Sequence, residues 1–225
     1  MRDKQIELLF KVLRILQKKG ALKHLVVVGS WCMYFYNFYF NKLETIASLR
    51  TRDVDFMIPD PKLLKIEIDL PEILKPLGFV IDYRGKEGYM RLVHPEFFIE
   101  FLVPKKGKDS DKAFTLPSLG LNAQRLRFLD ILYLKTVPIR VNGIKLIVSH
   151  PASFLLHKAI IFKKRSDKNK REKEIEQMQR IFEILNRKSN LTQVRQVFSM
   201  LHKKWQNKII TNLKEIGYAN IIKIL

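Results

Sequence analysis

The periodicity of apolar residues changes near residue 150, and this change limits the folds that are open to the chain. Before it, short apolar runs with strand spacing alternate with helical patterns, and after it every segment has helical spacing. The predicted strands are 25–28, 53–58, 79–83, 89–93, 97–103, 138–141 and 144–148, the predicted helices are 4–19, 31–40, 71–75, 151–163, 171–187, 192–206 and 208–217, and the segment 123–135 fits neither pattern. We therefore expect an α/β (α+β) domain with a mixed β-sheet over residues 1–149, followed by a helical domain over residues 150–225.

Turn and capping residues sharpen several of these boundaries. Asn142-Gly143 is a strong signal for a two-residue hairpin turn. Ser30 can cap the helix that follows it, and Ser149 and Pro151 fit a cap and a first helical position. The predicted elements therefore have local signals at their ends as well as the right periodicity.

The chain is strongly basic, with 42 Lys and Arg residues against 22 Asp and Glu residues and a net charge of +20. This charge divides as +9 before residue 151 and +11 from there on, so the helical part is the more basic per residue. Such a field attracts polyanions such as nucleic acids and nucleotides, or an anionic membrane surface. We find no apolar stretch long enough for a membrane-spanning helix, and the N-terminal segment is charged where a signal peptide has an apolar core.

The cysteine count and the absence of two glycine-rich motifs exclude several further kinds of site. Cys32 is the one cysteine, which excludes an intramolecular disulfide and a cysteine-based zinc site. We therefore expect a reducing compartment and a cytoplasmic protein. No Gly-x-Gly-x-x-Gly or Walker A sequence occurs, which argues against dinucleotide-binding and P-loop folds.

Two aspartates open an otherwise apolar strand, which is unusual because aspartate is depleted in strands. Period-two alternation places Asp53 and Asp55 on one face, about 7 Å apart, with apolar residues on the other. Two such carboxylates repel each other unless a cation lies between them, and oxygen ligands suit Mg²⁺ or Mn²⁺. The alternative is a surface strand end at which Asp53 pairs with Arg50 or Arg52.

Glu100 repeats this anomaly inside the predicted strand 97–103. Its neighbours on the same face, Phe98 and Leu102, are apolar, so the carboxylate needs a partner. If this strand pairs beside 53–58, Glu100 completes a three-carboxylate site. The alternative is a glutamate on an edge strand with its side chain in water.

Gly29 and Ser30 end the predicted strand 25–28 and open the helix after it. Glycine lets a phosphate approach the backbone, the serine offers a hydroxyl, and a helix N-terminus favours anions. The pair is a candidate phosphate site, although any turn between a strand and a helix can use the same two residues.

The order of these features resembles the nucleotidyltransferase superfamily, whose core is shared with DNA polymerase beta. The resemblance covers about residues 24–103 and rests on three motifs, Val28-Gly29-Ser30-Trp31, Arg52-Asp53-Val54-Asp55-Phe56 and Phe98-Ile99-Glu100. It looks most like uncharacterised bacterial nucleotidyltransferase-like proteins that are related to the nucleotidyltransferase toxins of abortive-infection systems. A toxin–antitoxin component is therefore one biological role to consider.

This resemblance implies an enzyme that transfers a nucleoside monophosphate from an NTP such as ATP to an acceptor hydroxyl and releases pyrophosphate. Asp53 and Asp55 would hold two Mg²⁺ (or Mn²⁺) ions, which clamp the entering and leaving oxygens of an in-line displacement. Glu100 would bind the metal that serves the attacking oxygen and help to deprotonate the acceptor. Gly29 and Ser30 would hold the triphosphate.

The helical part extends the resemblance. A segment from His157 to Arg165 that contains Lys158, followed by Lys173-Glu174, is similar to a segment after the core in those relatives, where a Lys and an Arg precede a Lys-Asp pair. Lys158 would then be a counter-charge for the triphosphate. Glu174 stands where aspartate is usual.

Residues 163–171 form a basic run between two predicted helices, and we interpret its six cations as contacts to the phosphates of an RNA or tRNA acceptor. These cations are Lys163, Lys164, Arg165, Lys168, Lys170 and Arg171. A solvated connection between helices is the alternative for this run. For the whole chain, the alternative to an enzyme is a non-catalytic module of the same fold that binds nucleic acid or a partner protein. The sequence leaves the NTP, the acceptor and the oligomeric state open.

Overall fold

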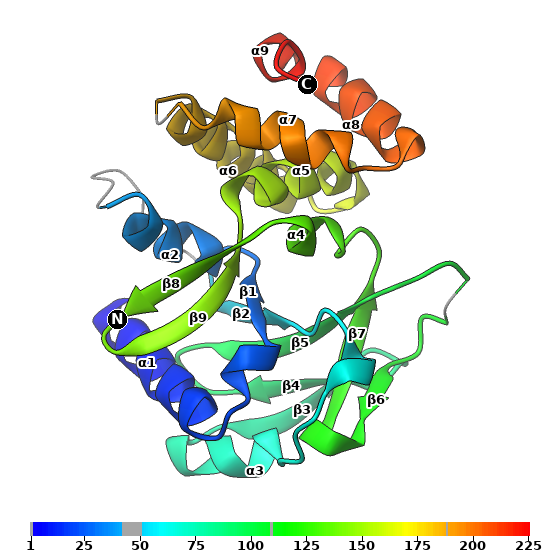
Figure 1. The fold of residues 1–225 in the computed structure, drawn as a ribbon. Helices are drawn as coiled ribbons and strands as arrows, with labels where there is room; N and C mark the ends of the chain where they lie inside the picture. Colours follow the sequence, from blue (N-terminus) through cyan, green and yellow to red (C-terminus); the bar gives the residue numbers. More distant parts are fainter. Residues whose placement is uncertain (1, 42–50, 109, 188) are drawn as a thin grey trace. The chain divides into compact units, whose positions relative to one another are not determined.

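The chain folds into two compact units in a computed structural model that describes residues 2–41, 51–108, 110–187 and 189–225. The sheet unit comprises Met1–Arg127 and Val137–Val148, and the helical unit comprises Phe128–Thr136 and Ser149–Leu225 (Figure 1). Phe128–Thr136 precedes the predicted boundary at 149/150 and belongs with the helices. The expected combination of a mixed sheet and C-terminal helices is confirmed.

A mixed sheet forms the centre of the sheet unit. Its strands in the described part of the chain are β1 (Val26–Val28), β2 (Asp53–Met57), β3 (Val80–Arg84), β4 (Tyr89–Val93), β5 (Phe98–Pro104), β6 (Phe114–Leu116), β7 (Leu121–Leu126), β8 (Thr136–Val141) and β9 (Ile144–Ser149). They lie in the order β3-β4-β5-β2-β1-β9-β8, while β7 pairs with β5 and with β6. The pairs β1–β9, β2–β5 and β5–β7 are parallel, whereas β1–β2, β3–β4, β4–β5 and β6–β7 are antiparallel.

Alternation of side chains makes one face of the two central strands wholly apolar, whereas the other face carries the predicted carboxylates and apolar side chains together. Val54 and Phe56 of β2 and Ile99 and Phe101 of β5 are fully buried, and the rings of Phe56 and Phe101 stack with their centroids 6.0 Å apart. Burial of each such side chain contributes roughly 1.5–3 kcal/mol, which holds β2 and β5 side by side. The predicted carboxylates lie on the opposite face, which also carries buried apolar side chains near the ends of both strands.

The helices described in the sheet unit are α1 (Arg2–Lys18), α2 (Trp31–Tyr39) and α3 (Leu70–Leu74). The end of α1 is fastened to the turn between β8 and β9, because the side-chain amide of Gln17 donates to the backbone oxygen of Gly143 at 3.2 Å and accepts from the backbone N–H of Lys145 at 2.7 Å. Asn142 and Gly143 both have positive φ, as the predicted two-residue hairpin requires.

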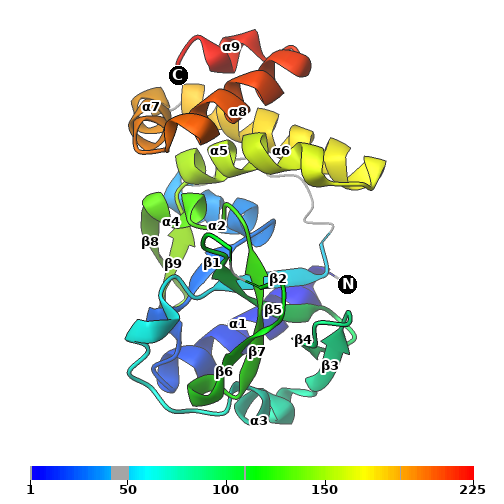
Figure 2. The ribbon, with the colours of Figure 1, turned by 90° about the vertical axis from the view of Figure 1, so that its right-hand side faces the viewer.

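The helical unit is built around α5 (Pro151–Ile161), which is buried along nearly its whole length. It packs against α4 (Ile131–Leu134), α6 (Lys168–Arg187), α7 (Leu191–Ser199) and α8 (Lys203–Glu215), and α9 (Ala219–Ile222) packs on α8 (Figure 2). Among the helices of the described ranges, none combines the length and the apolar character that crossing a membrane requires.

Two predicted helix caps are wrong. Ser30 lies at the N-cap position of α2, but its backbone is already helical and its side chain makes no capping hydrogen bond. His150 rather than Ser149 caps α5, because its Nδ1 accepts a hydrogen bond from the backbone N–H of Ala152 at 3.0 Å. Pro151 occupies the first turn of α5, as predicted.

The single helix predicted over 192–206 is also wrong, because the chain forms α7 and α8 with a break at His202. Gln206 holds this break: its buried side-chain amide donates to the backbone oxygens of Phe198 at 2.9 Å and Leu201 at 3.1 Å. A continuous helix would bond these carbonyls internally, so the side chain replaces helical hydrogen bonds. The apolar periodicity runs through the break and does not reveal it.

Candidate active site

The turn after β1 lies against a carboxylate of β2. Val28 is the register partner of Asp55, and Gly29 follows Val28 with a φ of +67°. A Cβ atom at Gly29 would lie 2.0 Å from Oδ2 of Asp55, so the left-handed backbone and the carboxylate both exclude a side chain here. Ser30, the next residue, is buried at the start of α2. The predicted phosphate turn and one predicted metal ligand are therefore in contact.

Asp55 and Glu100 lie directly opposite each other on neighbouring strands. They are register partners in the parallel pair β2–β5, and paired strands lie about 4.8 Å apart. Both residues are partly buried. β5 is an inner strand between β2 and β4, so the alternative of an edge-strand glutamate is wrong.

Asp53 shares the face of Asp55 and has a partner that sequence reasoning missed. The hydroxyl of the buried Thr51 donates a hydrogen bond to Oδ1 of Asp53. Arg52, offered as an alternative partner, donates instead to a backbone oxygen at 2.6 Å, and Arg50 lies outside the described residues. The two-residue spacing between Thr51 and Asp53 is the signal that could have found this contact, because it puts both on one side of an extended segment.

One arginine lies in the same row of the sheet. Register partners place Asp82 of β3, Arg91 of β4, Glu100 of β5 and Asp55 of β2 side by side. The guanidinium of Arg91 is bonded to Asp82 at 2.6 Å and lies 4.4 Å from the centre of the Phe98 ring. Alternation within β4 puts Arg91 on the face of Glu100, but only knowledge of the strand pairing could have shown it.

The donor chemistry of this face fits a hard divalent cation. Asp53, Asp55 and Glu100 offer carboxylate oxygens, which Mg²⁺ and Mn²⁺ prefer. In the described part of the chain, however, no group of three His, Cys, Asp or Glu side chains is arranged so that it could hold a metal ion. Joint ligation by the three carboxylates stays a prediction.

A second polar cluster lies in the helical unit. The ammonium group of Lys158 on α5 pairs with Glu174 on α6, and the two side chains are 7% and 8% exposed. The guanidinium of Arg165 lies 2.9 Å from the other carboxylate oxygen. Burial raises the pKa of Glu174, but the charges and hydrogen bonds of Lys158 and Arg165 outweigh burial and hold this pKa below its ordinary value. Lys158 is therefore compensated within its own unit, and its contact with a triphosphate stays a prediction.

His157 lies beside this cluster and is neutral near pH 7. Burial, and then the charge of Lys158, lowers the pKa of His157 to about 3, with a further lowering from Arg165 and an opposing effect of Glu174. A neutral imidazole offers no positive charge to a phosphate. His157 therefore belongs to the packing of the helical unit.

The six cations predicted to contact nucleic acid are all exposed, but their charges are not equally compensated. Lys163 pairs with Glu215, and Arg165 pairs with Glu174. Lys168 lies 3.9 Å from the carboxylate of Glu172, one turn further along α6. Lys164, Lys170 and Arg171 complete the set. Lys168, Lys170 and Arg171 lie at the start of α6, so the run is only partly a connection between helices.

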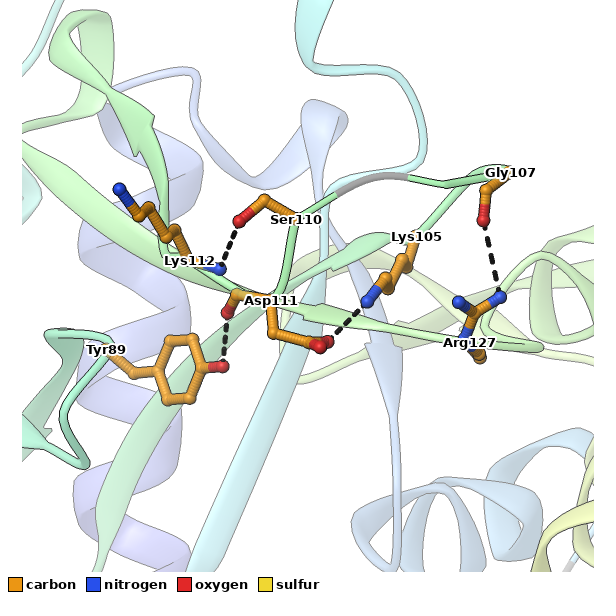
Figure 3. Close-up of polar contacts among 7 residues, drawn as sticks. All are labelled: Tyr89, Lys105, Gly107, Ser110, Asp111, Lys112 and Arg127. Atoms are coloured by element: carbon orange, nitrogen blue, oxygen red, sulfur yellow. Dashed lines mark hydrogen bonds and ion pairs between the residues drawn. The ribbon is translucent and has the colours of Figure 1, made fainter.

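A third polar cluster fastens the loop after β5 (Figure 3). Lys105 pairs with Asp111, the hydroxyl of Tyr89 donates to the backbone oxygen of Asp111 at 2.6 Å, and Arg127 donates to the backbone oxygen of Gly107 at 3.4 Å. The hydrogen bond and the charge of Lys105 lower the pKa of the Asp111 carboxyl. The carboxylate face lies toward the start of β5 and this loop follows its end, so the cluster stabilises the loop and is separate from that face.

Comparison with known proteins identifies the family. A family model described as "Nucleotidyltransferase" matches residues 7–203, which is most of the chain. The chain therefore belongs to this nucleotidyltransferase family, and the predicted superfamily and enzyme class are confirmed. No curated protein matches the sequence. The finer relation to abortive-infection toxins stays a prediction.

Three solved structures are similar to this chain, and the first of them supports the fold. The crystal structure of ANT(2″)-Ia in complex with adenylyl-2″-tobramycin has a TM-score of 0.51 at 11% identity, covering 88% of this chain and 98% of that chain. The solution structure of the antibiotic-resistance factor ANT(2″)-Ia has a TM-score of 0.47 at 10% identity, covering 97% and 96%. An antigenic nucleotidyltransferase-like protein from Paracoccidioides brasiliensis has a TM-score of 0.45 at 17% identity, covering 92% of each chain. At such identities the first likeness concerns the fold alone.

Proposed function

We propose that this nucleotidyltransferase works at the carboxylate face of the sheet and transfers a nucleoside monophosphate from an NTP to an acceptor hydroxyl, with release of pyrophosphate. The observation that carries the proposal is the contact of Gly29 with the carboxylate of Asp55, opposite Glu100 on the next strand. A phosphate held at the turn would lie next to two acidic side chains. Membership of the nucleotidyltransferase family supports this reaction.

In the proposed reaction, the acceptor oxygen attacks the α-phosphorus and forms a new P–O bond, while the bond from that phosphorus to the pyrophosphate oxygen breaks. Gly29 and Ser30 bind the triphosphate at the start of α2, where backbone N–H groups and the helix dipole favour anions. Glu100 accepts the proton of the acceptor hydroxyl, directly or through water.

Asp53, Asp55 and Glu100 would hold Mg²⁺ or Mn²⁺ in the working enzyme. Such ions neutralise the charge that develops on the entering and leaving oxygens. The same ions would relieve the repulsion between carboxylates on one face. The hydrogen bond from Thr51 would orient Asp53 for this role.

The acceptor we propose is an RNA, such as a tRNA. The charge of +11 from residue 151 onward supports this choice, because cations that contact phosphates gain affinity through counterion release. A small molecule is the second candidate, since the chain shares its fold with ANT(2″)-Ia, which was solved with adenylyl-2″-tobramycin. A small acceptor does not require so large a positive field.

The direct test offers each of the four α-labelled NTPs with Mg²⁺ and, in turn, total RNA, protein extract and small hydroxyl compounds. We expect transfer of label to one acceptor class, and loss of transfer in Asp55→Asn and Glu100→Gln. Glu7→Gln is the matched control, because Glu7 lies on α1 of the same unit, is 65% exposed and pairs with a lysine, Lys11, that is itself 51% exposed. Binding of NTP and RNA without transfer under any condition would favour the non-catalytic module.

A second measurement tests the acceptor class through RNA binding at two salt concentrations. Lys168→Glu and Lys170→Glu reverse exposed charges on α6 and leave the Arg165–Glu174 pair intact. We expect micromolar binding that weakens with salt and with reversal. Binding weaker than about 0.1 mM near physiological salt is no tighter than typical non-specific association and would move the acceptor to a small molecule or a protein.

A further inference from the structure

Two aromatic rings and two lysines meet within the helical unit. The rings of Phe128, which precedes α4, and Trp205, on α8, lie edge to face with their centroids 5.2 Å apart. The ammonium group of Lys164 lies 4.4 Å from the centre of the Phe128 ring, and that of Lys208 lies 5.7 Å from it. We call these four residues the aromatic–lysine cluster.

The aromatic–lysine cluster faces solvent. Phe128 and Trp205 are only partly buried, and Lys164 and Lys208 are exposed. Phe128 has a φ of +66°, a left-handed conformation that costs free energy for a bulky residue and persists only where surrounding contacts impose it. The fold thus holds a strained aromatic residue in a basic, accessible position.

We propose that the aromatic–lysine cluster is a stacking site for an unpaired base of single-stranded RNA, with Lys164 and Lys208 contacting the flanking phosphates. Proteins that bind single strands combine aromatic side chains, on which bases stack, with cations that follow the backbone. This inference depends on the proposed function only for the choice of RNA. The inference also specifies which part of the RNA is recognised: a single-stranded loop or end rather than a duplex.

In the structure, lysine ammonium groups lie over the ring of Phe128, where we propose that a base stacks. RNA binding would therefore exchange a lysine for a base on this ring. A base stacked on an aromatic ring contributes more binding free energy than an exposed cation–π contact does. A base can therefore displace a lysine from the ring of Phe128, and the displaced ammonium group is then beside the phosphate of the same nucleotide.

Tryptophan fluorescence gives a direct readout of stacking. The chain has two tryptophans, and Trp31 is 1% exposed in the sheet unit, where a base cannot stack on it. A short oligouridylate or oligoadenylate is titrated into the full chain in EDTA without NTP. We expect saturable quenching of Trp205. Trp205→Phe should abolish the quenching but keep affinity, measured by anisotropy of a labelled oligonucleotide, within about threefold, because a ring remains.

Removal of the ring and of the charge should have separable effects. Trp205→Leu should weaken oligonucleotide binding about tenfold with little change in its salt dependence. Lys208→Gln should lower the slope of log affinity against log salt by about 0.7, the value for one phosphate contact on a single strand. Lys214→Gln is the matched control, since Lys214 is an exposed lysine near the end of the same helix, and it should leave the quenching unchanged.

Two results would overturn the stacking site. One is equal oligonucleotide affinity in Trp205→Leu and the parent chain with no quenching, since the phosphates alone would then be bound. The other is equal quenching by polyglutamate, which has charge but no bases and would mark the surface as a site for any acidic polymer. Circular dichroism of each variant checks that the helices form. If a base stacks but no nucleotidyl transfer occurs, the proposed function is wrong and the stacking site stands. If transfer occurs but no base stacks, the stacking site is wrong and the proposed function stands.

Discussion

The carboxylates of the two units have different neighbours. In the sheet unit, Asp55 and Glu100 lie opposite each other on adjacent strands, and Asp53 shares their face. In the helical unit, Glu174 is buried between Lys158 and Arg165. The first arrangement gathers three carboxylates on one face, with Arg91 as the cross-strand neighbour of Glu100, and the second surrounds one carboxylate with two cations.

This difference matches the roles that we propose for the two places. Carboxylates that share one face repel one another, and a bound cation would lower that repulsion, as the proposed function requires. A buried carboxylate with two cations needs no ligand, and its lowered pKa shows that the folded chain itself stabilises the charge. Substitution at the two places should therefore affect different properties.

The largest effect is expected at Asp55. Asp55→Asn should reduce nucleotidyl transfer by about 10³-fold, because it removes a charge that would hold the metal and stabilise the transition state. The melting temperature without metal should stay equal or rise slightly, since one repulsive charge is gone. Label transfer and calorimetry on the same preparation measure both. A large loss of apo stability would show that Asp55 serves mainly to support the turn at Gly29.

The opposite pattern is expected at Glu174. Glu174→Gln should lower the free energy of unfolding by about 3 kcal/mol, because it leaves Lys158 buried without its partner. Urea denaturation measures this loss. Lys158→Met together with Glu174→Gln should recover part of the stability, since the unpaired charge is removed with its partner. An unchanged unfolding midpoint in the single variant would contradict the structural role.

Gly29 should show the crowding that defines the site. Gly29→Ala should cost about 2 kcal/mol of stability, from the left-handed backbone and from the contact with Asp55. Gly88→Ala is the matched control: Gly88 has a φ of +71° and open space around it, so it reports backbone strain alone. Thermal unfolding should rank Gly29→Ala as the more damaging. Equal losses in the two variants would mean that Asp55 moves aside freely.

The part of this site that follows from local pattern could be predicted. Alternation puts Asp53 and Asp55 on one face of a strand whatever the strand pairs with. The contact of Gly29 with Asp55 and the place of Arg91 beside Glu100 depend on the register between strands far apart in the sequence. Such register is a property of the sheet, and no single segment encodes it.

The secondary structure also divides into elements that the local sequence predicts and elements that depend on contacts between distant segments. β2 alternates between polar and apolar residues, β5 is a nearly continuous apolar run, and both were predicted within one residue at each end. β6 and β7 were not predicted, because their short mixed sequences become strands through pairing with each other and with β5. The break between α7 and α8 was missed because Gln206, a residue that is ordinary in helices, bonds backbone carbonyls through its side chain.

The smallest expected effect is a loss of stability at acidic pH that arises from two buried histidines of the helical unit. The pKa of buried His157 is lowered to about 3, whereas the same side chain in the unfolded chain takes up a proton near pH 6.5. The unfolded state therefore binds more protons between these values, and stability should fall with falling pH by at most about 1.4 kcal/mol per pH unit for this group. His150, with a pKa of about 4, acts in the same direction. The pKa of Glu174 is also lowered, so the stability that this carboxylate contributes is lost only below its ordinary range near 4.5 and does not change between pH 5 and 6.5.

Urea denaturation at pH 7.5, 6.5 and 5.5 measures the slope of unfolding free energy against pH. This slope should be reduced in His157→Gln and reduced further in the double variant with His150→Gln. The same slope in all three chains would show that neither histidine is held neutral by the fold.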